Sequence, residues 1–425
     1  DLGTASLKYK SFFAGLVDAE NFKINGGQGD DGQVLTSTGS GVAWEAGGGG
    51  GGVTFKEEGT NFTNSVMVGD SDTGTLSSAT GNTALGIDVF AALTSGINNV
   101  AVGYAAMTAL TSAYSNVAVG ANALDSLTSG HTSVAVGHNA LAGVTTAAYN
   151  IGIGTNAGVA LTTGAGNTVV GANSLNAGTT AVNNVVLGGY SATSITDGIG
   201  NTITGTVASI ALTTGDYNVN SGYAAGYAIT TGDANICMGA SAGLHLTTGS
   251  NNIAIGVNAL NGATTVSNQT AVGYQALQSL TTGEANTSVG YIALKLDTTG
   301  SYNAALGQNA LGSNTTASSN TGLGFSAGYG NTTGASNTFV GSSAGGSGTI
   351  HATGSNNTFI GAASGGTATD TLNANALGSG VKSETGYTTV GIDGSDIRAA
   401  NGTATWATVS DRRVKKDIED STAGL

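Results

Sequence analysis

The chain has 425 residues, of which 72 are glycine, none is proline and only 8% are charged. Its formal net charge is -14, and no Lys or Arg occurs between Lys56 and Lys295. That stretch offers nothing to phosphate groups, so the sequence excludes nucleic-acid binding for it. No apolar run reaches the length of a membrane span, so membrane insertion is not expected. Cys237 is the single cysteine and lies among small residues, which predicts a buried thiol and no intrachain disulfide.

Residues 1–60 alternate short apolar runs with glycine turns, as in Phe22–Gly27 and Gly32–Trp44. Such a pattern is typical of small β-hairpins, and we expect an N-terminal attachment or collar region here. The unbroken glycine run from Gly47 to Gly52 predicts a flexible joint. A phosphate-binding loop is the alternative, but no Gly-Lys followed by Ser or Thr is present after the run.

Residues 61–341 are dominated by a glycine at every seventeenth position. The series of seventeen glycines starts at Gly69 and ends at Gly341 without a slip. Four residues before the glycine stands Asn in fourteen copies, and three before it stands Val, Ile or Thr in sixteen. The residue directly before it is apolar in fifteen copies, and Ala follows three residues later in thirteen. A fixed period of this length predicts a solenoid.

Each repeat contains a strand signal. The run Asn99–Gly103 has β-branched residues on alternate positions, and the Asn and Gly that flank them suit corners. The second half has the pattern G-x-x-A-L-x-x-L, whose apolar spacing also fits a helix. Because two corners and a strand must share the seventeen residues, we expect an irregular turn or a short strand there instead. The interior columns are expected to be Val, Ile, Leu and Ala.

Stacked coils advance about 4.8 Å each, so seventeen coils predict a rod on the order of 80 Å long. Aromatic residues make up only 6% of the chain, which indicates a thin cross-section. A thin coil cannot bury its apolar side alone, so stability is shared between neighbours. The fold class we expect is therefore all-β, a parallel β-roll or β-helix rod that buries one apolar face against copies of itself in a parallel homotrimer.

The repeat resembles the head repeats of trimeric autotransporter adhesins, the left-handed parallel β-rolls of the YadA-like family. It is closer still to the T-A-V-G-Y-Q-A-L repeats of phage-derived tail-fibre proteins, and Thr270–Leu277 has that string. The residues from Gly32 to Trp44 are similar to a motif of phage tail fibres and other virion proteins, notably those of marine and cyanobacterial phages. The resemblance implies a trimer in which three β-rolls pack around a common axis.

The period is interrupted after Gly341, because the next Asn-Thr-Phe-Ile-Gly run, at Asn357, arrives three residues late. Longer coils predict protruding loops, and binding residues tend to lie on loops that a rigid scaffold holds. We therefore expect residues 342–409 to form an irregular distal region. A transition that merely ends the rod is the alternative.

The run S-D-R-R-V-K-K-D-I, from Ser410 to Ile418, resembles the opening of the endosialidase-type intramolecular chaperone domain of fibre C-termini. The resemblance implies that residues 410–425 start such a domain, most of which lies outside the chain. It also implies one self-cleavage event before Asp411, with Ser410 as nucleophile and Lys415 as its base. A Lys can act as a base only if its pKa is depressed, and neighbouring cations favour that. A charged tail is the alternative.

Candidate receptor-binding residues are aromatic, because rings can stack on sugars, although ring columns in solenoids also pack on one another. His131 and His138 could serve as metal ligands in a trimer, but no metal site is expected from such a pair, and no cofactor. Asp216 and Asp233 share one column and are expected to be solvated corner residues. The aromatic candidates are Trp406 and five residues that follow repeat glycines, Tyr104, Tyr223, Tyr274, Tyr291 and Phe325.

These features predict a structural virion protein, a trimeric tail fibre that positions a distal region for recognition of and adhesion to the host-cell surface. It would not be an enzyme, apart from the single self-cleavage of its precursor. The expected partners are further copies of the chain, other phage tail or baseplate proteins and a host-surface glycan or protein. The expected location is the tail of the virion, exposed outside the cell.

Two alternatives remain open for the rod. A bacterial surface adhesin of trimeric-autotransporter type predicts a C-terminal membrane anchor, and the chain shows none. An ice-binding solenoid requires Thr in every coil, whereas Thr stands three before the repeat glycine in only seven of seventeen copies.

Overall fold

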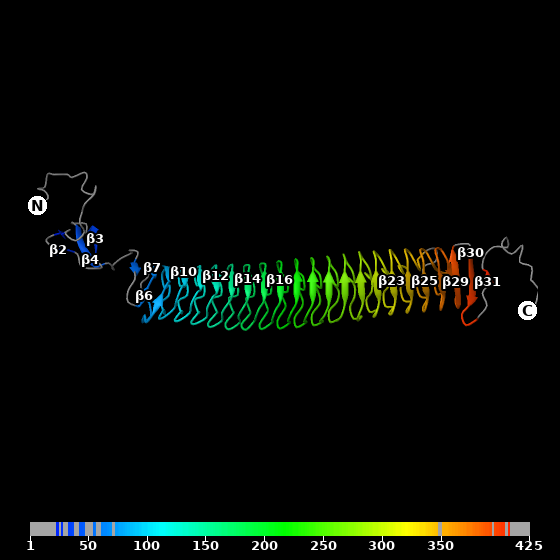
Figure 1. The fold of residues 1–425 in the computed structure, drawn as a ribbon, viewed down its shortest axis with the longest axis horizontal. Helices are drawn as coiled ribbons and strands as arrows, with labels where there is room; N and C mark the ends of the chain where they lie inside the picture. Colours follow the sequence, from blue (N-terminus) through cyan, green and yellow to red (C-terminus); the bar gives the residue numbers. More distant parts are fainter. Residues whose placement is uncertain are drawn as a thin grey trace, which may run out of the picture.

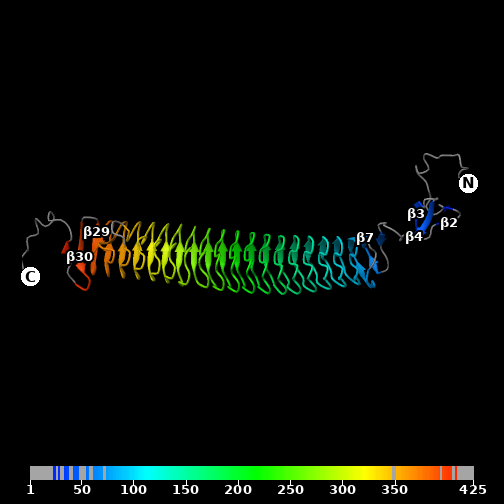
Figure 2. The ribbon, with the colours of Figure 1, turned by 180° about the vertical axis from the view of Figure 1, so that it is seen from behind.

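The computed structural model describes residues 23–24, 27–28, 33–37, 42–46, 54–56, 61–69, 73–346, 351–392, 395–403 and 407–408. In these residues the chain is all-β and contains no helix. Most of its strands are stacked along a straight rod, which Figure 1 and Figure 2 show from opposite sides. The prediction of an all-β solenoid with a seventeen-residue repeat is confirmed.

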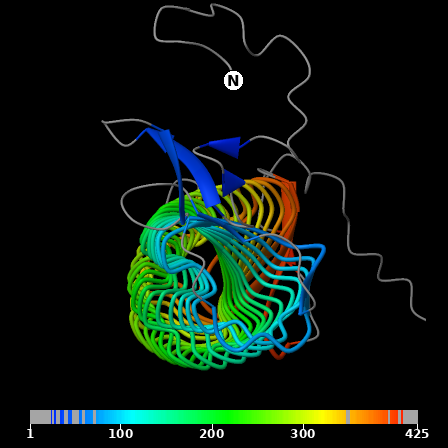
Figure 3. The ribbon, with the colours of Figure 1, turned by 90° about the vertical axis from the view of Figure 1, so that its left-hand side faces the viewer.

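One ladder of parallel strands runs along the rod, with one short strand per coil. Each strand pairs with its equivalent in the next repeat, as Val100 does with Val117 and Ala101 with Ala118. Figure 3, which looks along the rod, shows the successive coils superposed. The ladder strands of the regular repeats are β7 (Val66–Gly69), β9 (Thr83–Gly86), β10 (Val100–Val102), β11 (Val117–Val119), β12 (Val134–Val136), β13 (Ile151–Ile153), β14 (Thr168–Val170), β15 (Val185–Leu187), β16 (Thr202–Thr204), β17 (Val219–Ser221), β18 (Ile236–Met238), β19 (Ile253–Ile255), β20 (Thr270–Val272), β21 (Thr287–Val289), β22 (Ala304–Leu306), β23 (Thr321–Leu323) and β24 (Thr338–Val340).

The ladder continues beyond Gly341, where the strict period stops. β24 pairs in parallel with β25 (Thr358–Ile360), which pairs with β27 (Asn375–Leu377), which pairs with β29 (Tyr387–Ile392). The coil before β25 is longer than the repeat and the coil before β29 is shorter. Loop length varies between these coils while the stacking of the strands is kept, so the rod extends into the region after Gly341.

Antiparallel strands close the ladder at both ends. β5 (Thr54–Lys56) pairs with β7, and at the other end β30 (Ser395–Ala400) pairs with β29 and with β31 (Ala407–Thr408). Such capping matters because an open ladder end presents unpaired N–H and C=O groups to other chains. The remaining short strands form pairs of their own: β1 (Lys23–Ile24) with β2 (Gly27–Gln28), β3 (Gln33–Ser37) with β4 (Val42–Ala46), β6 (Phe62–Thr63) with β8 (Ala79–Thr80), and β26 (Gly365–Gly366) with β28 (Lys382–Ser383).

Left-handed backbone angles explain why the A-L-x-x-L half of the repeat is not helical. In the coil after Gly103, Ala105 has a φ of 52° and Met107 a φ of 53°, and equivalent residues of other coils adopt the same angles. Alternating left-handed residues turn the chain sharply and cannot propagate an α-helix. The expected irregular turn is therefore confirmed.

The orientation of the strands corrects one prediction. The middle residue of each ladder strand points inward, and in β10 and β11 these are the fully buried Ala101 and Ala118. The flanking β-branched residues, such as Val100 and Val102, point outward and are only half-buried. The expectation that Val and Ile form interior columns holds only in β14, β15 and β16, where the inward residues are Val169, Val186 and Ile203, and was wrong for the other strands. In most coils Leu side chains from the turns, such as Leu124, occupy the centre and leave room for a small strand residue. Where the turn residue is small, as at Gly345, the strand directs a large residue inward, as at Phe339.

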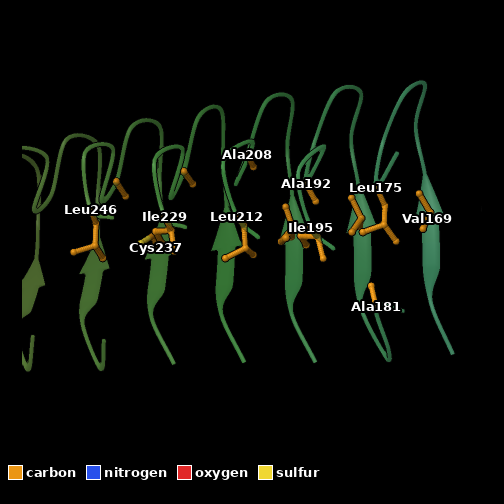
Figure 4. Packing of buried hydrophobic residues seen from close by; sticks show 14 of the residues in the cluster. Val169, Leu175, Ala181, Ala192, Ile195, Ala208, Leu212, Ile229, Cys237 and Leu246 are labelled. Carbon is orange, nitrogen blue, oxygen red and sulfur yellow. The ribbon is translucent and has the colours of Figure 1, made fainter. Parts of the chain in front are cut away.

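The inward side chain of a strand and the buried side chain of the turn that follows it are matched in size: where one is larger, the other is smaller. Where the inward strand residue is Ala254, the turn supplies the buried Leu260, whereas Cys237 is followed by Gly243. A Cβ on Gly243 would lie 2.6 Å from the Cys237 sulfur, so the two side chains compete for one space. Figure 4 shows Cys237 among the buried apolar residues of neighbouring coils. Each coil therefore fills its own part of the core with side chains from its own strand and turn.

A buried Asn ladder fixes the corner before the strands. The Nδ2 of Asn116 donates to Asn99 Oδ1 at 3.1 Å and to Gly130 O at 3.1 Å, and the Asn116 backbone N–H donates to the same Oδ1 at 3.0 Å. Both side chains are fully buried, so these bonds satisfy groups that water cannot reach. Ser133 and Gln269 replace Asn in two coils and keep the backbone bond to the preceding Asn.

Exchanging the sizes of the two facing side chains, Cys237 and Gly243, should leave the free energy of unfolding nearly unchanged. We predict that Gly243→Leu alone destabilises the rod by about 1–3 kcal/mol, because the added side chain meets Cys237. Combined with Cys237→Ala, it should recover most of that loss, since the pair then matches Ala254 and Leu260. Urea unfolding of both single variants and the double variant measures the coupling. Additive losses in the double variant would contradict volume compensation.

Candidate interaction face and polar sites

The first and third residues of the ladder strands from β7 to β25 form what we call the outward face. No described element covers these side chains, and several are more than a third exposed, among them Val119, Val136 and Ile153. Neither column contains a charged residue. With a spacing of about 4.8 Å per coil and strands about 10 Å wide, the face measures on the order of 800 Å². The face mixes aliphatic and Thr side chains. Its nearly continuous aliphatic part covers six strands, on the order of 300 Å², which is the size of the largest apolar patch on a typical monomer, and such patches often mark an interaction site.

The polarity of the outward face changes along the rod. From β10 to β15 both columns are aliphatic except for Thr168. Hydroxyl side chains interrupt the face at β16 and β17, where Thr202, Thr204 and Ser221 lie. Towards the C-terminal end one column becomes largely Thr while the other stays aliphatic. The most apolar part is therefore the segment from β10 to β15.

The five aromatic candidates all lie beside the ends of ladder strands with their rings exposed. Tyr274 and Tyr291 are neighbours and stack with ring centroids 5.3 Å apart and planes 12° apart. Tyr104, Tyr223 and Phe325 lie in coils that do not adjoin one another, so the structure brings together only one pair. The next residues of the same column are Val257 on one side of the pair and Gln308 on the other. Trp406, Ser410 and Lys415 lie outside the described residues.

A second aromatic group was missed by sequence reasoning. Tyr114 stacks on His131 with centroids 4.6 Å apart, and His131 meets Tyr149 edge-on at 5.0 Å. Tyr114 and His131 are one period apart, so the sequence spacing could have predicted their contact. Tyr149 is one residue out of that column, and its contact could not be predicted in this way. His138 follows β12 while His131 precedes it, so the structure does not bring the two histidines together. Within the described residues no group of three or more His, Cys, Asp or Glu residues is placed to hold a metal ion.

The acidic corner residues cap backbone amides. Asp233 Oδ1 accepts a hydrogen bond from the N–H of Asp216 at 2.8 Å, and Asp216 Oδ1 accepts one from the N–H of Ile199 at 2.7 Å. Ser250 performs the same role for Asp233 at 3.0 Å. Asp233 is exposed, as expected, whereas Asp216 is half-buried, and both carboxylates join consecutive coils.

An unbroken Thr column runs from Thr94 to Thr332, at the first Thr of the L-T-T-G part of the repeat. The sequence shows the column, but its hydrogen bonds were not predicted. The Oγ1 of Thr111 donates to Thr128 O at 3.0 Å, and Thr298 donates in the same way to Thr315 at 2.8 Å. These hydroxyls form bonds within the rod and are less available to order water or ice. The ice-binding alternative gains no support from this column.

Buried polar residues replace Leu in one interior column near the C-terminal end. Leu280 is followed there by Asp297, Asn314 and Asn331, each fully buried. Asp297 Oδ1 accepts from the Gly300 N–H at 2.8 Å, and its Oδ2 accepts from the Nδ2 atoms of Asn303 and Asn314 at 3.2 Å. Asn331 in turn donates to Asn314 at 3.1 Å. The sequence shows the change from Leu to polar residues in this column, but the burial of these polar residues was not predicted.

Burial raises the pKa of two groups in the rod interior. The pKa of Asp297 rises to about 6 because desolvation outweighs the hydrogen bonds that favour its charged form. Burial raises the pKa of the Cys237 thiol to about 12, so the thiol is protonated and unreactive at neutral pH. The prediction of a buried free cysteine is confirmed.

Comparison with protein-family models, with curated proteins and with solved structures found no match. In the part of the chain that the structure describes, no helix is long and apolar enough to cross a membrane.

The raised pKa of Asp297 predicts a pH dependence with a definite sign. The folded state holds the Asp297 proton more tightly than the unfolded state, so this stability is fully present below pH 3.8 and is lost as the pH rises through about 6. The loss should be on the order of 2–3 kcal/mol. The difference in urea unfolding between the parent chain and Asp297→Asn, measured from pH 4 to 7, should show it, because every other titrating group is common to the two chains. Asp197→Asn, at an exposed site, should leave the profile unchanged, and an unchanged profile in Asp297→Asn would contradict the assignment.

Proposed function

We propose that the chain is the rod of a trimeric phage tail fibre, which positions a distal region for recognition of the host-cell surface. The observation that carries this proposal is the outward face, which is long, straight, uncharged and uncovered. A stable interface buries about 800 Å² per partner, and the face offers an area of that order. Its columns repeat at the coil spacing, so another copy of the same rod in parallel register provides a matching set of ridges.

The resemblance of the repeat to phage fibre proteins and trimeric adhesin heads supports three copies around one axis. The fold supports a mechanical role, because every coil is tied to the next by backbone, Asn and Thr hydrogen bonds. The capped ladder ends favour lateral assembly over end-to-end polymerisation. In this proposal the region after Gly341 contributes to the distal part, and the partners are other tail proteins and a host-surface glycan or protein.

Receptor binding and self-cleavage are further parts of the proposal. Tyr274 and Tyr291 form the aromatic pair with which a glycan is most readily tested, because the two rings are stacked and both are exposed. Ser410 and Lys415 would act once, in a longer precursor, through the nucleophile and base roles that the chaperone resemblance implies.

Charge introduced on the outward face should prevent assembly without unfolding the coil. We predict that Val119→Lys combined with Val136→Lys converts a trimer into monomers, because the interface would have to bury adjacent unpaired ammonium groups. Native mass spectrometry measures the assembly, and circular dichroism checks that the β fold persists. The same experiment gives the subunit mass, which shows whether the chain ends at Ser410.

The matched control is Thr146→Lys combined with Thr163→Lys, which adds the same charge at exposed turn positions of neighbouring coils. This control should remain a trimer. A parent chain that is monomeric at micromolar concentration would overturn the proposal, and a trimer that survives the Val119 and Val136 changes would place the interface on another face.

A further inference from the structure

His351 is a buried titratable group that belongs to no site described so far. It lies in the longer coil before β25, in the same interior column as Asn331, and its side chain is 1% exposed. The alignment follows from Thr332, whose N–H and Oγ1 both donate to Ala352 O. The imidazole contacts the Phe359 ring, with centroids 4.7 Å apart. A histidine therefore occupies a position that is Leu in seven of the fifteen earlier coils and polar in the last three of them.

The ring holds the backbone of β26 by a hydrogen bond that requires the neutral form. The Gly366 N–H donates to His351 Nε2 at 2.5 Å, so the ring proton must be on Nδ1. The Nδ1 atom is buried and has no hydrogen-bond partner among the residues that the structure describes. A Cβ on Gly366 would fall 2.2 Å from His351 Cε1, which shows how closely the ring packs on this strand.

β26 in turn connects the last coils to one another. It pairs in parallel with β28, through the Gly365 N–H to Val381 O at 2.9 Å and the Thr367 N–H to Ser383 O at 3.1 Å. β28 is followed directly by β29, the final parallel strand of the ladder. Loss of the bond from Gly366 to His351 would therefore loosen the C-terminal end of the rod and leave the earlier coils intact.

The charged groups around His351 oppose a second proton. Lys382 on β28 lies on the same side of Gly365 as the ring, since a Cβ there would be 3.4 Å from Lys382 Nζ and 3.5 Å from His351 Nε2. The other ionisable groups on the elements packed against the ring are Asp370, in the turn after β26, and Glu384, which pairs with Arg398 at 2.8 Å. No carboxylate is recorded in contact with the ring in the described residues.

We propose that His351 is an acid-operated latch: a second proton on its ring releases β26 from the interior and opens the C-terminal coils while the rod up to β24 stays folded. Protonation places a hydrogen on Nε2, where the Gly366 N–H now donates, and creates a cation beside Lys382. The latch operates within one chain and does not depend on the proposed function.

The direction of the pKa shift of His351 determines whether acid or base weakens the C-terminal coils. Burial, and after it the Lys382 charge, lowers the pKa of His351 to about 4. The neutral ring therefore contributes stability that is fully present above the unfolded value of 6.5 and is lost as the pH falls towards 4. At pH 4 the equilibrium for local opening should have moved towards the open state by on the order of 100-fold relative to neutral pH.

Hydrogen exchange with mass spectrometry at pH 7 and pH 4, corrected for intrinsic exchange rates, tests the latch. In the parent chain, protection from β25 to β29 should fall by on the order of 100-fold at pH 4, whereas protection from β10 to β15 should not change. His351→Gln should abolish the fall, because its Oε1 can accept from Gly366 and cannot be protonated. His245→Gln, at an exposed histidine, should behave like the parent chain.

Equal protection of β25 to β29 at both pH values in the parent chain would overturn the proposal, as would an undiminished fall in His351→Gln. Lys382→Met provides a second test if His351→Gln does not fold. Removal of that charge brings the pKa of His351 closer to its ordinary value, so the fall should be smaller than in the parent chain. A fall equal to that of the parent chain would count against the latch.

Discussion

Everything in this molecule depends on the contact between each coil and the next. A single coil contains one short strand and a few interior side chains, too little to be stable alone. Stacking supplies the backbone bonds of the ladder, and the buried Asn ladder and the Thr column add side-chain bonds in the same direction. All three sets of hydrogen bonds run along the rod axis and hold consecutive coils together. The side chains on the different faces of the rod can therefore vary without loss of these bonds.

The narrow interior explains the rest of the architecture. Leu side chains from the turns fill it in most coils, so most strands direct a small residue inward and β-branched residues outward, and a large inward residue such as Phe339 requires a small residue in the turn. The outward face is thus a consequence of the cross-section of the coil. Towards the C-terminal end the same interior accepts Asp297 and His351, and their burial makes two otherwise ordinary side chains responsive to pH in opposite directions.

The sequence predicted the solenoid, its period, its corners and its buried cysteine, because each is a repeated local pattern that one coil is enough to define. It could not predict which strand face lies inside. Alternating Val and Ala fit either orientation, and the Leu side chains that decide the matter come from a turn whose backbone angles were not foreseen. The aromatic groups show the same limit: Tyr274 and Tyr291 stack because they are one period apart, but Tyr149 joins His131 from a different column. Burial of Asp297 likewise depends on its column, whereas Asp216 has the same charge at a solvated corner.

The tolerance of the ladder to longer and shorter coils after Gly341 has a consequence for how such a molecule can change over generations. Strand pairing between coils survives a gain or loss of residues in the loop. Duplication of one repeat would lengthen the rod by about 4.8 Å and leave both capped ends as they are. The length of the rod is therefore set by the number of repeats in the sequence. It can change by whole repeats while the structure of each coil stays the same.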